Sequence, residues 1–322
     1  MDKKYRYEKI DTVVWKYTPT LKELIEKDQK IRDHKISRPD FFICGAAKSG
    51  TTSLFNYLGQ HPSIFTSAWK EPGYFSALRP MKSPHRYGQL FDEAETGQLI
   101  GEASGAYLTS PDSALRISEA VPEAKIIIML RNPADRAFSL YNWMAKEGYE
   151  WVPTFERALR LEEKRRDSVS FVKNNPEYYY NFLYHTTGCY TRQIERFLNA
   201  FDREHLRFLI FDDFVESPVS CTKEIFRFLE VDESIKIRTP VRNKGKSVYS
   251  VPLQFWLRHR ARPVSRKIPL GIRLVRKAMQ WNRSAKKPNL SDRCRHRLLQ
   301  YYEEDIRETS ALIGRDLASR WL

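Results

Sequence analysis

The segment FFICGAAKSGTTSLFNYL, residues 41–58, constrains the fold of this 322-residue chain more than any other stretch. FFICG is an apolar run that ends in glycine, which predicts a buried strand, whereas the apolar residues of TTSLFNYL recur at helical spacing. A glycine-rich turn between a strand and a helix presents backbone amides at the positive end of the helix dipole, where anions bind. Lys48 adds a full charge and the neighbouring Ser and Thr residues add hydroxyl donors, so a phosphate or sulfate is the expected ligand.

Strand-like and helix-like segments alternate along most of the chain. Further strands are predicted at 63–67, 98–104, 124–130 and 206–214, and helices at 111–121, 132–146, 186–201, 217–231 and 298–314. Asn132 is the expected cap of the second of these helices, with Pro133 and Asp135 in its first turn. The alternation predicts an α/β fold of three layers, in which helices flank a central parallel β-sheet.

Two segments differ from the rest of the chain in their charged residues. Residues 1–37 are charged and loosely helical, which predicts an N-terminal extension packed on a single domain that spans residues 38–322. Within that domain, residues 235–290 contain sixteen Lys or Arg and no Asp or Glu. Apolar and basic residues alternate there at roughly helical spacing, which predicts a basic lid that contacts an acceptor or an acidic membrane surface; a solvated face is the alternative.

Composition narrows the classes of partner and compartment. The net charge of +15 attracts phosphate-bearing ligands, polyanions and acidic membranes without choosing among them, but the usual nucleic-acid-binding motifs are missing from the sequence. The four cysteines form no CxxC pair and no histidine lies at metal-ligand spacing, so neither a disulfide framework nor a zinc site is expected. Without a signal-like or membrane-spanning apolar run, we expect a cytoplasmic protein, soluble or peripheral at a membrane.

The turn departs from the loop that nucleotide triphosphatases use. In GxxxxGK[ST] the lysine follows the second glycine, whereas Lys48 precedes Gly50. The strongest strand ends at Arg131, where such enzymes place an aspartate that helps to hold Mg²⁺. An arginine there repels a metal and attracts an anion, which predicts a metal-free site with two separated anion pockets. A P-loop kinase or NTPase remains one alternative, and a basic nucleic-acid- or membrane-binding protein is another.

Three stretches in this order resemble the sulfotransferases that use 3′-phosphoadenosine 5′-phosphosulfate (PAPS): GAAKSGTTSL at 45–54, LRNPADRAFSLY at 130–141 and RNKGKSVYS at 242–250. SAWKEPGYF at 67–75 is similar to a stretch of the carbohydrate (heparan sulfate type) and bacterial branch. The resemblance implies the P-loop NTPase-like sulfotransferase fold, PAPS as co-substrate, PAP as product, and a carbohydrate, lipid or other small-molecule acceptor. Ala103 and Gly73 replace a lysine and a histidine of the heparan 3-O-sulfotransferases, so a heparan-like acceptor is not implied.

The resemblance also implies roles for individual residues. Glu71 corresponds to the catalytic base that takes the acceptor proton, with Lys48 neutralising the leaving 5′-phosphate. Arg131 and Ser139 correspond to the 3′-phosphate site, and Phe211 to an adenine-stacking position, although Phe211 as a strand residue could equally be core. The implied cofactor-binding set is Ala47, Lys48, Ser49, Gly50, Thr51, Thr52, Arg131, Ser139, Phe211, Arg242, Lys244 and Gly245. The acceptor-binding candidates are Trp69, Tyr74 and Glu102, the last being a second candidate base or the partner of a nearby cation.

Overall fold

The computed structural model describes residues 38–76, 81, 83–175, 178–240, 247–265, 270–284 and 288–322. The expected N-terminal extension therefore lies outside the described residues. So do Arg242, Lys244 and Gly245 of the late basic loop, whose roles stay predictions.

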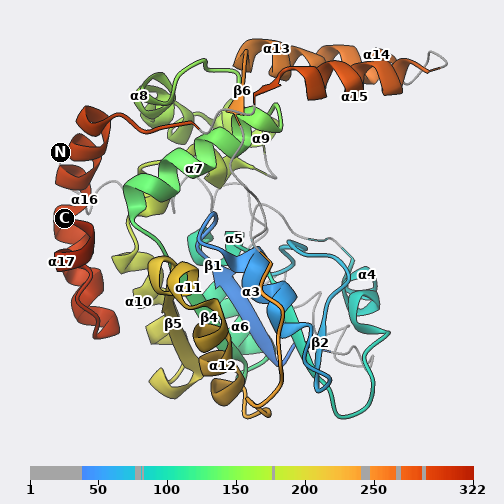
Figure 1. Ribbon diagram of the computed structural model, residues 1–322, viewed down its shortest axis with the longest axis vertical. Helices are drawn as coiled ribbons and strands as arrows, with labels where there is room; N and C mark the ends of the chain where they lie inside the picture. The colour runs from blue at the N-terminus through green and yellow to red at the C-terminus, as the bar shows by residue number, and fades with distance from the viewer. Residues whose placement is uncertain are drawn as a thin grey trace.

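Five parallel strands form the central sheet in the order β2-β3-β1-β4-β5 (Figure 1). Register places Phe42 of β1 between Glu102 of β3 and Ile126 of β4, so the glycine turn follows the middle strand. The strands are β1 Phe41–Gly45, β2 Ile64–Thr66, β3 Leu99–Ala103, β4 Lys125–Leu130 and β5 Leu206–Ile210. All four further strands that the sequence predicted are thus present.

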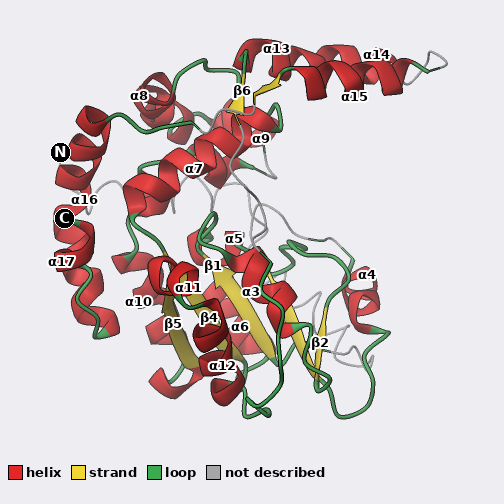
Figure 2. Ribbon diagram, in the orientation of Figure 1, coloured by secondary structure: helices red, strands yellow, loops and turns green. Residues whose placement is uncertain are grey.

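Helices cover both faces of this sheet, because successive residues of a strand point to opposite sides. Phe41 and Ile43 of β1 pack in one core with α3 and α12, and Phe42 and Cys44 pack in the other core with α6 and α10. Figure 2 shows the strand arrows between these helices, which confirms the predicted three-layer α/β fold. The helices on the two faces are α3 Thr51–Leu58, α12 Pro218–Phe228, α6 Ser113–Ala120 and α10 Thr191–Ala200.

A second group of helices lies toward the carboxyl ends of the strands, on the side to which β1 points in Figure 1. Its central member is α7, which begins as predicted: the Asn132 side chain accepts from the amides of Ala134 and Asp135, with Pro133 in the first turn. Further helices of the body are α4 Pro84–Gly88, α5 Ala106–Thr109, α7 Pro133–Lys146, α8 Phe155–Arg166, α9 Val169–Asn174, α11 Phe211–Glu216, α16 Asp292–Ile313 and α17 Ala318–Trp321.

One predicted strand is too long. The segment 206–214 forms β5 only to Ile210, and Phe211–Glu216 is a helix, α11. Asp212 and Asp213 lie in its first turn, where negative side chains are favoured by the helix dipole. Phe211 is therefore a helix-start residue at the carboxyl end of β5 and not a strand residue.

A helical arm extends from the body at the top of Figure 1. It consists of α13 Val251–Trp256, a π-helical turn Leu257–Ala261, α14 Arg262–Ser265 and α15 Gly271–Trp281. A short antiparallel pair at its base, β6 Ser247–Val248 and β7 Arg283–Ser284, joins it to the body beside α7. Across the described part of the chain, no helix combines the length and apolarity needed to cross a bilayer.

Candidate functional site

The turn between β1 and α3 has the backbone of an anion-binding loop. Gly50, with φ of 91°, precedes α3, and a Cβ there would lie 3.2 Å from the Phe211 ring, so only glycine fits without strain. Lys48 also has a positive φ, 74°, which is uncommon for a residue with a side chain and is typical of functional turns. Gly45 is equally constrained, since a Cβ would lie 2.9 Å from Leu108.

Several donors in this turn have no acceptor within the described residues. The amides of Ala47, Lys48, Gly50, Thr51 and Thr52 donate to no other described group, and no side chain caps α3. The Ser49 hydroxyl is fully buried and likewise makes no hydrogen bond there. Since buried polar groups are nearly always satisfied, this convergence of open donors fits a bound phosphate or sulfate group.

Arg131, at the end of β4, lies directly against the turn. Its Nη1 donates to the Lys48 carbonyl oxygen over 3.0 Å, and its guanidinium lies 4.4 Å from the centroid of the Phe211 ring. Burial lowers its pKa, but an arginine stays charged at any ordinary pH. The two cations that the sequence assigned to the two phosphates thus lie at one turn, and the prediction that they serve two separate anion pockets stays a prediction.

Phe211 packs against Arg131. One face of its ring carries the guanidinium, and its edge lies against Gly50. Adenine stacking on Phe211 stays a prediction, and it requires the base to use the other face or the arginine to move.

Lys48 lies in a strongly positive environment. Burial and the nearby cations Lys146, Arg131 and Lys70 lower its pKa to about 8, and Glu71 opposes that shift. Its Nζ lies 5.6 Å from the centroid of the Trp143 ring. Lys146 and Trp143 were not among the predicted site residues.

One helix supplies these additional groups. Ser139, Trp143 and Lys146 of α7 are spaced by four and three residues and so share a helix face. The Ser139 hydroxyl is half-buried and makes no hydrogen bond to another described residue, so its proposed contact with the 3′-phosphate stays a prediction. Helical spacing from Ser139 was the signal that could have found Trp143 and Lys146.

Glu71 follows β2 on the other side of the turn, in a backbone conformation with φ of 69°. Its amide donates to the Ala103 carbonyl oxygen over 2.9 Å, and its Oε2 accepts from the Gly105 amide over 2.8 Å. Its Oε1 pairs with Lys70. The carboxylate is half-buried and interacts electrostatically with Lys48, which places the predicted base and the predicted phosphate-binding cation in one site.

Glu102 does not belong to the acceptor surface. It is 0% exposed, so no acceptor can reach it, and the predicted acceptor-binding role is wrong. Its partners are hydroxyl groups and no described cation: Ser104 donates to Oε1 over 2.6 Å, and Tyr87 and Tyr107 each donate to Oε2 over 2.7 Å. Ser104 in turn accepts from the Gly73 amide over 3.0 Å, so Glu102 supports the segment 67–75 that carries Glu71, which we call the strap.

The burial of Glu102 has a measurable consequence for stability. Desolvation raises its pKa to about 7 against the hydroxyl hydrogen bonds that lower it, whereas the reference value for the unfolded chain is 4.5. The folded state therefore binds this proton more tightly, and the free energy of unfolding falls by about 3 kcal/mol as the pH rises from 4.5 through 7. We expect Glu102→Gln to remove about that much of the difference between chemical denaturation at pH 5 and at pH 8. The exposed Glu123→Gln control should keep the difference, and an unchanged pH dependence in Glu102→Gln would contradict this assignment.

The two aromatic residues predicted to bind the acceptor differ in how exposed they are. Tyr74 is half-buried and stacks on Tyr87 with ring centroids 4.2 Å apart, so it packs against the core next to Glu71. Trp69 is exposed on the same strap. Acceptor binding by either residue stays a prediction.

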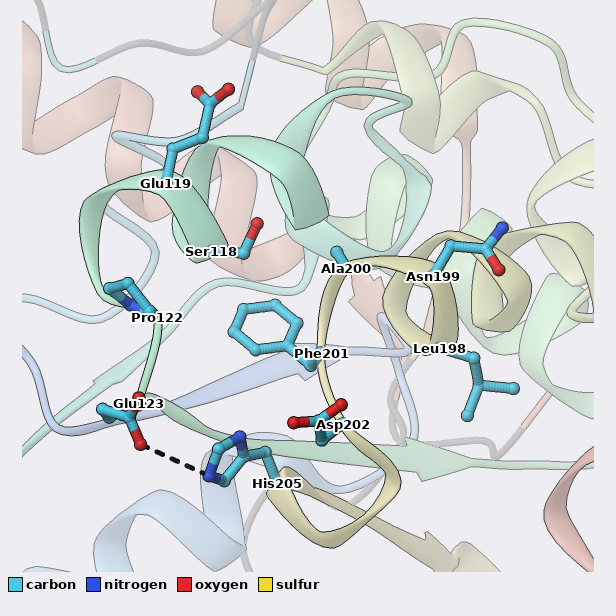
Figure 3. A pocket seen from close by; sticks show the side chains of 10 residues that line it. All are labelled: Ser118, Glu119, Pro122, Glu123, Leu198, Asn199, Ala200, Phe201, Asp202 and His205. Carbon is cyan, nitrogen blue, oxygen red and sulfur yellow. Dashed lines mark ion pairs between the residues drawn. The ribbon is translucent and has the colours of Figure 1, made fainter.

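A pocket of about 420 Å³ lies elsewhere in the molecule (Figure 3). Its lining includes Glu123, just before β4, and His205, just before β5; the Glu123 Oε2 and the His205 Nε2 are 3.8 Å apart. It thus opens at the amino ends of these strands, opposite to the turn. Ligands of open parallel sheets bind at the carboxyl ends, so the turn and its surrounding cations are the better candidate.

Comparison with known proteins gives a family and a fold. A family model described as a sulfotransferase domain matches residues 38–244. The crystal structure of a sulfotransferase from Alicyclobacillus acidocaldarius has a TM-score of 0.68 and 29% identity, and the match covers 89% of this chain and 99% of that one.

The curated relatives are longer proteins. A bifunctional heparan sulfate N-deacetylase/N-sulfotransferase 1 from Caenorhabditis briggsae is 23% identical over 206 residues, 62% of this chain and 23% of that protein. The membrane-associated sulfotransferase kil1 of Dictyostelium discoideum is 35% identical over 107 residues, 33% of this chain and 23% of that protein. This chain therefore matches about a quarter of the length of these relatives.

Proposed function

This chain belongs to the sulfotransferase domain family, and from that premise we propose that it transfers a sulfuryl group from PAPS to a hydroxyl or, less favourably, an amine of its acceptor. The observation that carries the proposal is the meeting of Lys48 and Arg131 at a turn whose amides and Ser49 hydroxyl are open. Such a set of donors suits a nucleotide with phosphate groups on both sides of its ribose.

The proposed reaction divides its work among three groups. The acceptor oxygen forms a bond to sulfur as the bond between sulfur and the bridging oxygen of the 5′-phosphate breaks. Glu71 takes the proton that the acceptor hydroxyl loses, since its carboxylate is oriented by the Gly105 amide and faces the same site as Lys48. Lys48 and the open amides stabilise the negative charge that grows on the leaving phosphate, and the products are PAP and a sulfate ester.

For the 3′-phosphate we propose Arg131 and Ser139, closed over by Arg242, Lys244 and Gly245. Arg131 is held in place by the Lys48 carbonyl and Phe211, and the half-buried Ser139 hydroxyl makes no other hydrogen bond to a described residue. Two of the five guanidinium donors are enough for a forked contact to a phosphate.

The acceptor we propose is a carbohydrate or a lipid-linked sugar. Support comes from the relatives named for heparan sulfate and from the resemblance of SAWKEPGYF, residues 67–75, to a stretch of the carbohydrate branch. Lys70 and Lys146 border the site beside Glu71 and Lys48, so an acceptor that carries negative charge would be attracted.

Ligand-induced stabilisation tests the nucleotide part of this proposal. We expect PAP, at about a hundredfold excess over its Kd and without added metal, to raise the unfolding temperature by roughly 5 °C, and ADP to raise it much less. Arg131→Ala should abolish the preference for PAP, because ADP carries its second phosphate on the 5′ side and lacks the 3′-phosphate that Arg131 is proposed to bind. Differential scanning fluorimetry measures both shifts.

Arg207→Ala is the matched control, since Arg207 is an exposed arginine on the neighbouring strand β5. It should keep the full preference for PAP. Equal stabilisation by ADP and PAP in the unmodified chain, or a requirement for Mg²⁺, would favour a P-loop kinase or NTPase and contradict the proposal.

A further inference from the structure

The helical arm exposes large apolar side chains on α13 and on α15. Leu274 and Trp281 of α15 are seven residues apart, which places them on one helix face, and the exposed Leu270 lies just before the first turn of that helix. Leu274 is 66% and Trp281 71% exposed, and Trp256 on α13 is 53% exposed. Several exposed apolar side chains of this size on one arm mark a candidate interaction surface.

The charges on the arm are of one sign. Residues 235–290 contain no acidic side chain, and Arg260, Arg273, Arg276 and Lys277 are exposed. None of these four forms an ion pair with a carboxylate among the residues that the structure describes. The Lys277 amine lies 5.1 Å from the centroid of the Trp281 ring, so a positive charge and an aromatic ring lie side by side on α15. That pairing is typical of side chains at a membrane–water interface.

We propose that the helical arm docks on an anionic lipid bilayer. Its leucines and tryptophans enter the boundary between headgroups and acyl chains, and its arginines and lysine contact lipid phosphates. A soluble polyanion would account for the arginines but would leave Leu270 and Leu274 in water. A second copy is disfavoured because two arms of the same strong positive charge repel each other.

The arm is fixed to the helix that borders the proposed active site. Gln254 donates to the Lys146 carbonyl oxygen over 2.8 Å, and Arg258 donates to the Glu147 carbonyl oxygen over 3.0 Å. These bonds satisfy the last carbonyls of α7, whose Trp143 and Lys146 lie beside Lys48. Docking would therefore hold the site close to the lipid surface, which suits a lipid-linked acceptor; this last step rests on the proposed function.

Vesicle co-sedimentation of the full chain tests the docking itself. The probes are vesicles of phosphatidylcholine alone and of phosphatidylcholine with about one third phosphatidylserine. We expect binding only to the second kind. Arg273→Gln with Arg276→Gln should weaken it about 25-fold, roughly fivefold for each charge, and Leu274→Ser with Trp281→Ser should weaken it at least about tenfold.

The controls come from α11 and α12, which lie at β5, below the arm in Figure 1. Val215→Ser, at a position 62% exposed, and Arg227→Gln should bind as the unmodified chain does. Circular dichroism and PAP-induced stabilisation check that each variant is folded. Because the sedimentation assay contains no PAPS, absence of vesicle binding would leave the transferase proposal intact. Conversely, a protein that does not bind PAP could still bind vesicles.

Four results would overturn the docking proposal. Binding that does not depend on phosphatidylserine, or that survives both double variants, removes its physical basis. If vesicle binding is lost when Arg273→Gln and Arg276→Gln are combined but not when Leu274→Ser and Trp281→Ser are combined, the arm is assigned to a soluble polyanion. Absence of vesicle binding, together with self-association that Leu274→Ser and Trp281→Ser abolish, assigns the apolar face to a second copy.

Discussion

Lys48→Ala should lower sulfuryl transfer from PAPS by about 10²- to 10³-fold while the protein remains folded. The expected loss is that seen when one preorganised donor to a developing negative charge is removed. Folding should not suffer, because burial and the neighbouring cations already disfavour the charged form of Lys48, as its lowered pKa of about 8 shows. Steady-state transfer of labelled sulfate and thermal unfolding of the same preparations measure the two effects.

The pH profile separates this role from a merely structural one. In the unliganded protein Lys48 loses its proton as the pH rises through about 8, so the affinity for PAP should fall over that range. In Lys48→Ala the affinity should be lower and should lack that fall. A variant with near-normal turnover and the original pH dependence would remove Lys48 from the mechanism.

Glu71→Gln should lower turnover by about 10²- to 10⁴-fold, the range that a positioned general base contributes. Glutamine keeps the shape of the side chain and can still accept from the Gly105 amide, so the strap should stay in place. PAP-induced stabilisation should be nearly unchanged, because the carboxylate is proposed to act on the acceptor and not on the nucleotide. Transfer assays with a panel of sugars and glycolipids give the rate, and fluorimetry gives the nucleotide affinity.

Glu123→Gln is the control for Glu71→Gln. Its side chain is 88% exposed at the remote pocket, and its loss should leave both measurements unaltered. If Glu71→Gln transferred sulfate at the normal rate, the proton would have to go to another base. Glu102 could not be that base without a structural change, since it is buried behind the strap.

Features that depend on local sequence were predicted correctly. The strand–turn–helix unit, the apolar strand before Arg131 and the Asn132 cap each follow from neighbouring residues, and all are present. Parallel strands with intervening helices then fix where the strands end, which explains why Lys48 and Arg131 meet. The resemblance to sulfotransferases rested on the same local motifs and is confirmed by the family match.

The errors arose where partners are distant or where two local signals compete. The hydroxyls around Glu102 come from Tyr87, Ser104 and Tyr107, and no spacing rule shows that they converge on a buried carboxylate. At Phe211 an apolar strand runs into two aspartates that favour a helix start, and the strand was extended too far. The contacts between the arm and α7 join residues more than one hundred positions apart, which the sequence alone does not reveal.

The stack of Arg131 on Phe211 affects how a nucleotide would be gripped. A free arginine on a surface gives up roughly 2 kcal/mol of rotamer freedom when a ligand fixes it. Here the guanidinium is immobilised between an aromatic ring and a backbone oxygen as the chain folds, so little of that loss remains for the moment of binding. Tight recognition can then be reached with few contacts, and a lysine, whose flexible ammonium lacks the planar fork, would not be an equivalent replacement.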